Sequence, residues 1–214
     1  MRVDVSRLHF PVTTLGPGRR AGLWFQGCSI RCPGCISVDT WQNGVGSVTT
    51  DMVIQQLSLV SGDAEGLTVS GGEPLDQGDA LAEILAAWRG MSSRSVLVFT
   101  GRKWGEAQAW IELHPHLIDA IVTEPFRSDL PQTLALRGSD NQELHLLSQL
   151  GEEFRVYDRP ADASDRRLDV MFDEAGDAWF AGIPGRGDIA RLRRALADAG
   201  HRSTTSETTG AFTA

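Results

Sequence analysis

The sequence is poor in cysteine and in basic side chains, and it has no long apolar run. Among its 214 residues no stretch approaches the ~20 continuous apolar residues that a membrane-spanning helix needs. Residues 1–12 lack the apolar core and cleavage site of a signal peptide, so we expect a cytoplasmic protein with no membrane partner. Acidic side chains outnumber basic ones by 28 to 20, the net charge is −8, and no basic run is present. This balance argues against nucleic-acid binding.

Apolar segments alternate with segments of helical periodicity. Buried strands are predicted by four runs of branched or aromatic side chains, at residues 22–26, 67–70, 96–100 and 118–123. Helices are predicted by apolar side chains at helical spacing, at residues 51–60, 79–89 and 103–113, with Thr49 or Thr50 as the first N-cap. Such alternation is typical of parallel strands joined by helical crossovers, so we expect an α/β fold.

The composition changes after Tyr157. Residues 158–167 are polar and typical of a linker, and two strands are predicted at residues 168–172 and 178–183. Gly176 is a candidate for a left-handed position in the loop between them. An amphipathic helix is predicted at residues 187–199, with Ile189, Leu192 and Leu196 inward and Gly200 as its stop. We therefore expect a core domain at 1–157, a hairpin-plus-helix extension at 158–201 and a disordered tail at 202–214.

All three cysteines, Cys28, Cys32 and Cys35, lie within eight residues at the spacing C-x3-C-x2-C. An odd, clustered set is unlike a disulfide framework, and thiolates so close together favour zinc or an iron–sulfur cluster. A structural zinc site would need a fourth ligand, for which His9, His114 and His145 are the candidates. None of these stands at finger-like spacing, which favours a [4Fe–4S] cluster held by three cysteines, with one iron left open.

A resemblance extends this interpretation. The cysteine triplet directly after a strand, followed about 35 residues later by a second strand and Gly71-Gly72-Glu73-Pro74, resembles the radical S-adenosylmethionine (radical SAM) superfamily. A closer resemblance, over roughly residues 12–147, is to the activating proteins of anaerobic (class III) ribonucleotide reductase. It rests on the segments GPGRR, LWFQGC, RCPGC, LTVSGGEPL, VFTG and LRGSDNQ, at residues 16–20, 23–28, 31–35, 67–75, 98–101 and 136–142.

This resemblance implies a partial (β/α)6 barrel of about six parallel strands. It also implies an open iron that chelates S-adenosylmethionine, whose reductive cleavage gives methionine and a 5′-deoxyadenosyl radical, and a radical transferred to a glycine of a partner enzyme. By analogy Cys28, Cys32 and Cys35 are the cluster ligands. Cosubstrate contacts are implied for Gly71, Gly72, Glu73, Pro74, Gly34 and Thr100, and no catalytic side chain is implied. A flavodoxin or ferredoxin is the expected electron donor.

Other features allow two interpretations. Gly16-Pro17-Gly18 and Arg20 either form a plain turn or shape the mouth where a partner loop enters, and Arg137-Gly138-Ser139 is either structural or a partner site. Glu124 is a candidate for an acid that the family carries one position away. The compact members of the family end near residue 147 of this sequence. The residues that follow are either an extra layer on the core or a docking surface for a different substrate. The alternatives to a glycyl-radical activase are thus a radical SAM enzyme that modifies another protein or peptide, and a non-catalytic metal-binding module.

Overall fold

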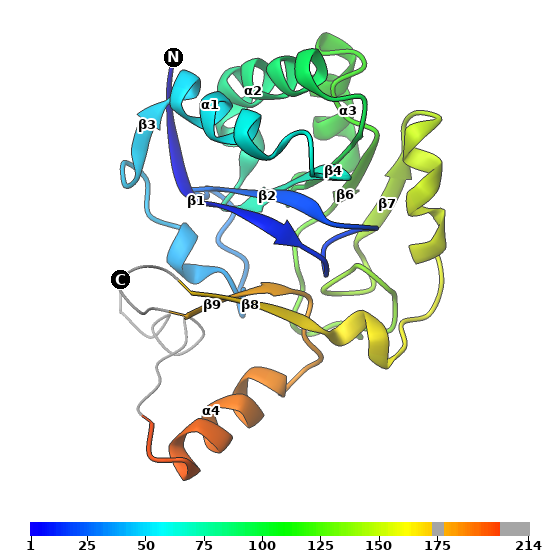
Figure 1. The fold of residues 1–214 in the computed structure, drawn as a ribbon. Coiled ribbons are helices and arrows are strands. Elements are labelled where there is room, and N and C mark those ends of the chain that lie inside the picture. Colours follow the sequence, from blue (N-terminus) through cyan, green and yellow to red (C-terminus); the bar gives the residue numbers. More distant parts are fainter. Residues whose placement is uncertain (173–177, 202–214) are drawn as a thin grey trace.

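The computed structural model describes residues 1–172 and 178–201. Its centre is a seven-stranded sheet in the order β3-β1-β2-β4-β5-β6-β7 (Figure 1). The strands are β1 (Arg2–Val12), β2 (Arg20–Phe25), β3 (Ser47–Thr49), β4 (Gly66–Gly71), β5 (Ser95–Phe99), β6 (Ala120–Thr123) and β7 (Glu143–Leu146). A separate two-stranded sheet is formed by β8 (Leu168–Phe172) and β9 (Ala178–Gly182).

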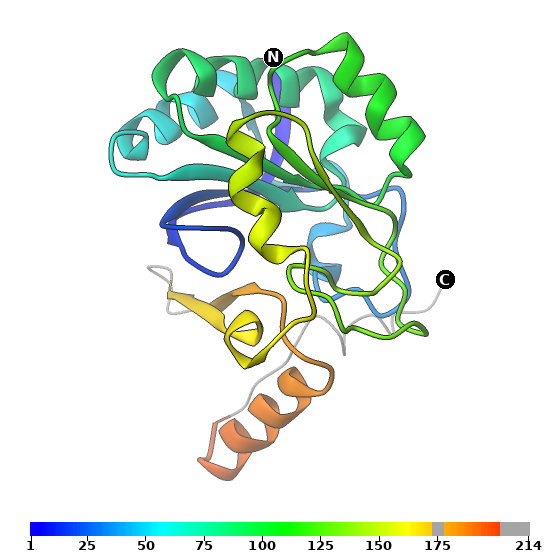
Figure 2. The ribbon, with the colours of Figure 1, turned by 90° about the vertical axis from the view of Figure 1, so that its right-hand side faces the viewer.

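Three helices cover one face of the large sheet (Figures 1 and 2). They are α1 (Thr50–Val60), α2 (Gly78–Met91) and α3 (Trp104–Leu113). Thr49 is the N-cap of α1, where its hydroxyl accepts the N–H of Met52. The apolar faces of α1 and α2 meet the sheet in the main core, where Leu57, Leu81 and Trp88 are fully buried. Short 3-10 helices lie at Val38–Thr40, Pro74–Gln77, Leu150–Tyr157 and Ala163–Arg166.

The sheet confirms the α/β expectation in its coarse form. β2, β4, β5 and β6 are parallel neighbours, and each corresponds to a strand predicted from the sequence. Among the described residues the parallel strands number four, where about six were expected. β1, β3 and β7 run antiparallel to their neighbours, and their sequences lack a continuous apolar run because most of their residues are only half-buried.

The hairpin and helix after residue 157 are present, as α4 (Asp188–Asp198) follows β9. They lie on the side of the large sheet away from α1 and α2 (Figure 2). Met171 and Ala181 pack there against Val12, Leu15 and Trp24 in a second apolar cluster. Ile189 is buried and Leu192 and Leu196 are half-buried, as predicted, and Gly200 adopts a left-handed φ of 85° just after the helix. Gly176 and residues 202–214 lie outside the described residues.

The Asp169 carboxylate joins the hairpin to the end of β1. It accepts hydrogen bonds from the backbone N–H and the hydroxyl of both Thr13 and Thr14, at 2.6–3.1 Å. Arg186 contacts the loop after β6, where its guanidinium donates to the carbonyl oxygens of Ser128 and Leu130. The segment from β8 to α4 is therefore attached to two separate parts of the core.

The helices of the described part of the chain are all too short or too polar to cross a membrane.

Candidate iron–sulfur and cosubstrate site

A cavity of about 850 Å³ lies where the parallel strands end. Cys28 follows β2, Gly71 ends β4 and Thr100 follows β5, so three neighbouring parallel strands deliver these residues to the same edge of the sheet. The carboxyl ends of parallel strands are where α/β folds place their ligand sites, because the loops that follow the strands converge there. The cavity also contacts the hairpin β8–β9, so the extension forms one of its walls.

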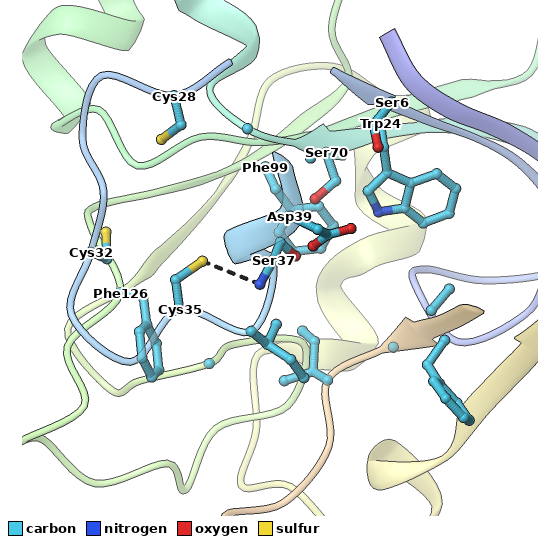
Figure 3. A pocket seen from close by; sticks show the side chains of 18 of the residues that line it. Ser6, Trp24, Cys28, Cys32, Cys35, Ser37, Asp39, Ser70, Phe99 and Phe126 are labelled. Atoms are coloured by element: carbon cyan, nitrogen blue, oxygen red, sulfur yellow. Dashed lines mark hydrogen bonds between the residues drawn. The ribbon is translucent and has the colours of Figure 1, made fainter. Parts of the chain in front are cut away.

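The three cysteines all line this cavity (Figure 3). Their loop is closed at its base by backbone hydrogen bonds from Gly27 N to Thr40 O at 2.7 Å and from Cys28 N to Trp41 O at 3.2 Å. Cys28 is buried, whereas Cys32 and Cys35 are partly exposed toward the cavity. All three thiols are free, and burial raises the pKa of Cys32 and Cys35. An iron centre would lower these pKa values, because it binds the thiolate form.

The described residues offer no ready site for a single metal ion. Among the residues that the structure describes, no group of three His, Cys, Asp or Glu side chains is close enough to hold one metal ion. In an iron–sulfur cluster each thiolate binds a different iron, so its ligands lie farther apart than those of one zinc ion. His145 instead stacks on Trp104 with ring centroids 3.8 Å apart, and His114 stacks on Trp110 at 4.4 Å. Neither these two histidines nor His9 belongs to a group of ligands that could hold a zinc ion in the described chain.

The turn after β4 packs directly on the residue before Cys28. Gly72 N donates to Phe25 O at 2.9 Å, and Glu73 N donates to Gly27 O at 2.8 Å. A Cβ atom at Gly72 would stand 2.0 Å from Gly27 O, so only glycine permits this approach. Gly71 has a φ of 107°, which places it in the region that favours glycine. Both glycines leave backbone facing the cavity, where a ligand can come close.

Glu73 is a fully buried carboxylate beside the cysteines. It accepts hydrogen bonds from the Thr100 hydroxyl at 2.7 Å, from Gly101 N at 2.8 Å and from Leu75 N at 2.9 Å. Burial raises its pKa, although the three hydrogen bonds oppose that rise. Glu73 forms no ion pair with a side chain of the described residues, and such a buried carboxylate is a suitable acceptor for a ligand ammonium group.

The remaining predicted contacts lie close by. Gly34 lines the cavity between the second and third cysteines and has a φ of 77°, and Thr100 lines it beside Glu73. Pro74 is buried at the start of the 3-10 helix behind Glu73 and does not line the cavity. The structure therefore brings together the three cysteines, Gly34, Gly71, Gly72, Glu73 and Thr100.

Sequence reasoning missed the aromatic part of the cavity. Trp24 on β2, Phe99 on β5 and Phe126 in the loop after β6 line it (Figure 3). Trp179 adds a ring from β9. The Arg7 guanidinium lies over the Trp179 ring, 4.2 Å from its centroid, and forms an ion pair with Asp39. The strand pattern does not reveal such contacts, because they depend on which face each strand turns to the cavity.

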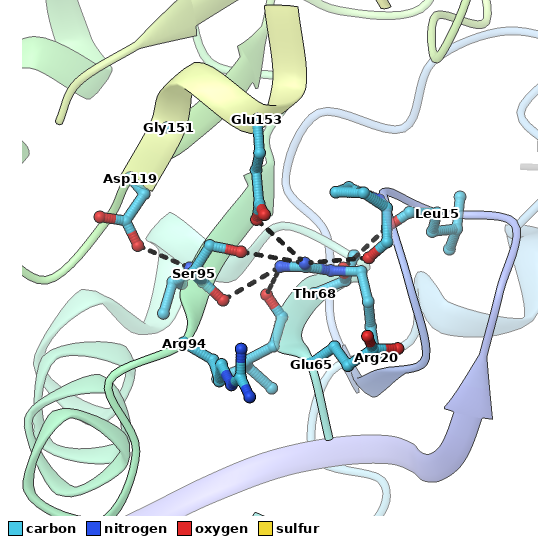
Figure 4. A network of polar contacts seen from close by, with 12 residues as sticks. Leu15, Arg20, Glu65, Thr68, Arg94, Ser95, Asp119, Gly151 and Glu153 are labelled. Carbon is cyan, nitrogen blue, oxygen red and sulfur yellow. Dashed lines mark hydrogen bonds and ion pairs between the residues drawn. The ribbon is translucent and has the colours of Figure 1, made fainter. Parts of the chain in front are cut away.

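Arg20 begins β2 and therefore lies at the opposite end of that strand from Cys28, which follows it. Figure 4 shows its polar contacts. Its side chain is fully buried, and the guanidinium donates to the Thr68 hydroxyl at 2.7 Å, to Leu67 O at 2.8 Å and to both oxygens of Ser95 at 3.0–3.1 Å. Burial lowers its pKa to about 10. Gly16 packs against the Arg20 side chain, so this turn braces the amino-terminal ends of β2, β4 and β5 and does not shape the mouth of the cavity.

Two further candidates are occupied elsewhere. Arg137 is buried and donates to the carbonyl oxygens of Ala135 and Tyr157, so it holds a loop, although its neighbour Gly138 lines the cavity. Glu124 has a left-handed φ of 76°, and its carboxylate accepts the N–H of Trp104 at the start of α3. These contacts explain both side chains structurally.

Comparison with known proteins agrees with this geometry. The family described as "4Fe-4S single cluster domain" matches residues 14–145. The anaerobic ribonucleoside-triphosphate reductase-activating protein of Salmonella typhimurium is 33% identical over 148 residues, which is 65% of this chain and 96% of the relative. The protein of the same name from Enterobacteria phage T4 is 31% identical, over 60% of this chain and 85% of the relative.

The pyruvate formate-lyase-activating enzyme of Listeria monocytogenes is 31% identical over 63% of this chain and 52% of its own length. The family match contains all three cysteines, the glycine turn and Thr100, and it ends before the hairpin β8–β9. The chain belongs to the radical SAM family of glycyl-radical activating proteins, with a single 4Fe-4S cluster domain.

Proposed function

We propose that this protein uses its [4Fe–4S] cluster and S-adenosylmethionine to install a glycyl radical on a partner enzyme of the anaerobic ribonucleotide reductase type. The observation that carries the proposal is the meeting of three free thiols and the buried Glu73 carboxylate in one cavity. When bound, the two cofactors supply one electron and a sulfonium carbon–sulfur bond, whose cleavage yields methionine and a 5′-deoxyadenosyl radical. The protein contributes binding, orientation and exclusion of water.

The residues present suit that task. Cys28, Cys32 and Cys35 supply three thiolates and leave one iron for a ligand. Glu73 would accept a hydrogen bond from the methionine ammonium group, and the backbone at Gly71 and Gly72 would let that group approach. Thr100 fixes the Glu73 carboxylate through its hydroxyl, so its support for the cosubstrate would pass through Glu73. The Gly34 backbone would face the adenine.

We further propose that the mixed sheet is one wall of a partial barrel that is open toward the partner. The cavity lies at the carboxyl ends of the four parallel strands, where barrel enzymes carry out their chemistry. Residues 1–157 would form the core domain and residues 158–201 an added wall. A flavodoxin or ferredoxin would deliver the electron.

The cofactor chemistry is tested on the anaerobically reconstituted full chain. We expect about four iron and four sulfide per chain, no stoichiometric zinc, and release of 5′-deoxyadenosine after addition of dithionite and S-adenosylmethionine. Cys32→Ala should abolish that product, whereas Ser58→Ala, an exposed change on α1, should leave it unchanged. Stoichiometric zinc, or product formation by Cys32→Ala at the wild-type rate, would refute the proposed function.

The partner is tested separately. An anaerobic reductase with a C-terminal glycine site, encoded beside this protein, should acquire a glycyl radical signal in electron paramagnetic resonance (EPR) spectra when mixed with the loaded protein.

The second candidate is a radical SAM enzyme that modifies a different protein or peptide. It is favoured by one observation, that the hairpin β8–β9 beyond the family match forms part of the cavity wall. Cleavage of S-adenosylmethionine without a radical on the reductase would support this candidate over the first.

A further inference from the structure

One carboxylate outside the predicted site, that of Asp76, connects the segments that build it. Asp76 lies in the 3-10 helix Pro74–Gln77, three residues after Glu73. Its Oδ2 accepts the N–H of Ser29 at 2.8 Å and its Oδ1 accepts the Ser29 hydroxyl at 2.9 Å. Ser29 directly follows Cys28, so Asp76 holds the peptide unit attached to the first thiol.

The third segment enters through Arg102, which follows β5. Its Nη2 donates to Asp76 Oδ1 at 2.5 Å and to the Ser29 hydroxyl at 3.1 Å. The hydrogen bond to Asp76 raises the pKa of Arg102, so its guanidinium remains protonated. The backbone N–H of Arg102 also donates to the Thr100 hydroxyl, which in turn donates to Glu73. A continuous chain of hydrogen bonds therefore runs from Ser29 through Asp76 and Arg102 to Glu73.

The location of this chain distinguishes it from an ordinary surface ion pair. The side chains of Asp76 and Arg102 are only 21% and 34% exposed, and Asp76 makes three hydrogen bonds. The cysteine loop has neither helix nor strand between residues 26 and 37, and its backbone hydrogen bonds to the rest of the core end at Gly27 and Cys28. The Ser29 contacts with Asp76 are therefore the next anchor along the loop. The Asp76 carboxylate accepts both the N–H and the hydroxyl of Ser29 and so fixes the first half of the cysteine loop against the glycine turn.

We propose that Asp76 is a positioning residue that holds the Cys28 end of the cysteine loop in register with the Glu73 carboxylate, with Arg102 as its counter-ion. This inference rests on the proposed function, because the register matters if one ligand must reach both the open iron and Glu73. Asp76 acts through Ser29 and Arg102. Loss of the anchor should therefore weaken binding of S-adenosylmethionine more than it slows the cleavage of bound cosubstrate.

The test compares Asp76→Asn with Asp79→Asn in the full, reconstituted chain. Asparagine keeps the size of the side chain, but both Asp76 oxygens accept from donors, so its NH2 group faces a donor in either orientation. Asp79 is an exposed acid three residues later, in the first turn of α2, and its substitution removes the same charge. The melting temperature of the cluster-free proteins is measured alongside to check that both variants fold.

Three measurements decide the outcome. For Asp76→Asn we expect iron loss to a chelator to be about tenfold faster, and the KM for S-adenosylmethionine to rise about tenfold with a smaller change in kcat, since supporting residues around metal sites typically contribute 10- to 100-fold. The EPR signal of the reduced cluster should need a correspondingly higher S-adenosylmethionine concentration to change. Asp79→Asn should match the wild type in all three measurements.

The proposal is overturned if Asp76→Asn and Asp79→Asn behave alike. It is also overturned if iron is lost faster while S-adenosylmethionine binding is unchanged, because that result assigns Asp76 a purely structural role. If Asp76→Asn does not fold, Ser29→Ala and Arg102→Gln each remove one arm of the anchor, and wild-type binding in both variants would equally refute it. A wild-type protein that binds no cluster would instead refute the proposed function.

Discussion

Replacement of Gly72 by alanine tests whether the glycine turn must touch the residue before the first cysteine. The new Cβ would stand 2.0 Å from Gly27 O, whereas real Cβ atoms essentially never come within 3.0 Å of such a neighbour. The obstructing atom is backbone, so the turn and residue 27 must separate by about 1 Å. That shift would break the Glu73 N–H to Gly27 O hydrogen bond of 2.8 Å. Overpacking of this kind costs about 1–3 kcal/mol.

At roughly 2–4 °C per kcal/mol for a chain of this size, the cluster-free protein should melt about 2–12 °C lower. The KM for S-adenosylmethionine should rise at least tenfold, since Glu73 moves with the turn. Gly90→Ala is the matched control, because no atom lies within 4 Å of its new Cβ in α2. It should raise the free energy of unfolding by about 0.4–1 kcal/mol, because alanine lowers the conformational entropy of the unfolded chain, and it should leave the KM for S-adenosylmethionine unchanged. The measurements are the melting temperature, followed by circular dichroism, and the KM for S-adenosylmethionine. A Gly72→Ala protein that matches the wild type in both would refute the argument that the turn needs this close approach.

Three further predictions concern other parts of the molecule. Burial raises the pKa of Glu73, and only the ionised form attracts an ammonium group, so kcat/KM for S-adenosylmethionine should fall as the pH drops through that raised pKa. Glu73→Gln should remove this pH dependence and lower kcat/KM at neutral pH at least tenfold, because a hydrogen bond to a charged group contributes about 1.5–3 kcal/mol of binding free energy. An unchanged pH profile would exclude Glu73 as the acceptor of the ammonium group. Arg20→Leu should destabilise the protein by about 3 kcal/mol in chemical denaturation, because it leaves the buried hydroxyl and carbonyl partners of the guanidinium without a donor. The KM for S-adenosylmethionine should stay unchanged, since Arg20 begins β2 and does not line the cavity; a raised KM would contradict that separation. Asp169→Ala should make the segment between the core and β8 sensitive to limited proteolysis without loss of 5′-deoxyadenosine formation. If the variant resists the protease as well as the wild type does, the contacts of Asp169 with Thr13 and Thr14 do not hold the hairpin.

Much of the fold followed from local pattern. The four parallel strands and the helices α1 to α4 were predicted because buried strands are continuous apolar runs and amphipathic helices repeat every 3.6 residues. β1, β3 and β7 were not, since they pair at the margins of the sheet and have mixed, half-buried sequences. Their direction is set by which neighbour they meet, and no short segment contains that information.

The candidate site divides in the same way. Spacing alone brought Cys28, Cys32 and Cys35 onto one loop, because residues so near in sequence cannot lie far apart. The meeting of that loop with Glu73 and Thr100 depended on the parallel order of β2, β4 and β5, which the strand pattern and the family resemblance together anticipated. Asp76, Arg102 and Trp179 carried no signal in the sequence, because each acts through a contact between segments far apart along the chain.

The amino-acid sequence by itself determined the kind of chemistry available, namely clustered thiols and an acidic side chain in a glycine turn. The tertiary structure decided what those groups can do together. It buried Glu73 beside the thiols, placed Arg20 at the start of β2 away from the cavity, and packed the hairpin β8–β9 against that cavity. Reactive groups are local properties of residues, whereas burial, register and access arise only when distant segments pack against one another.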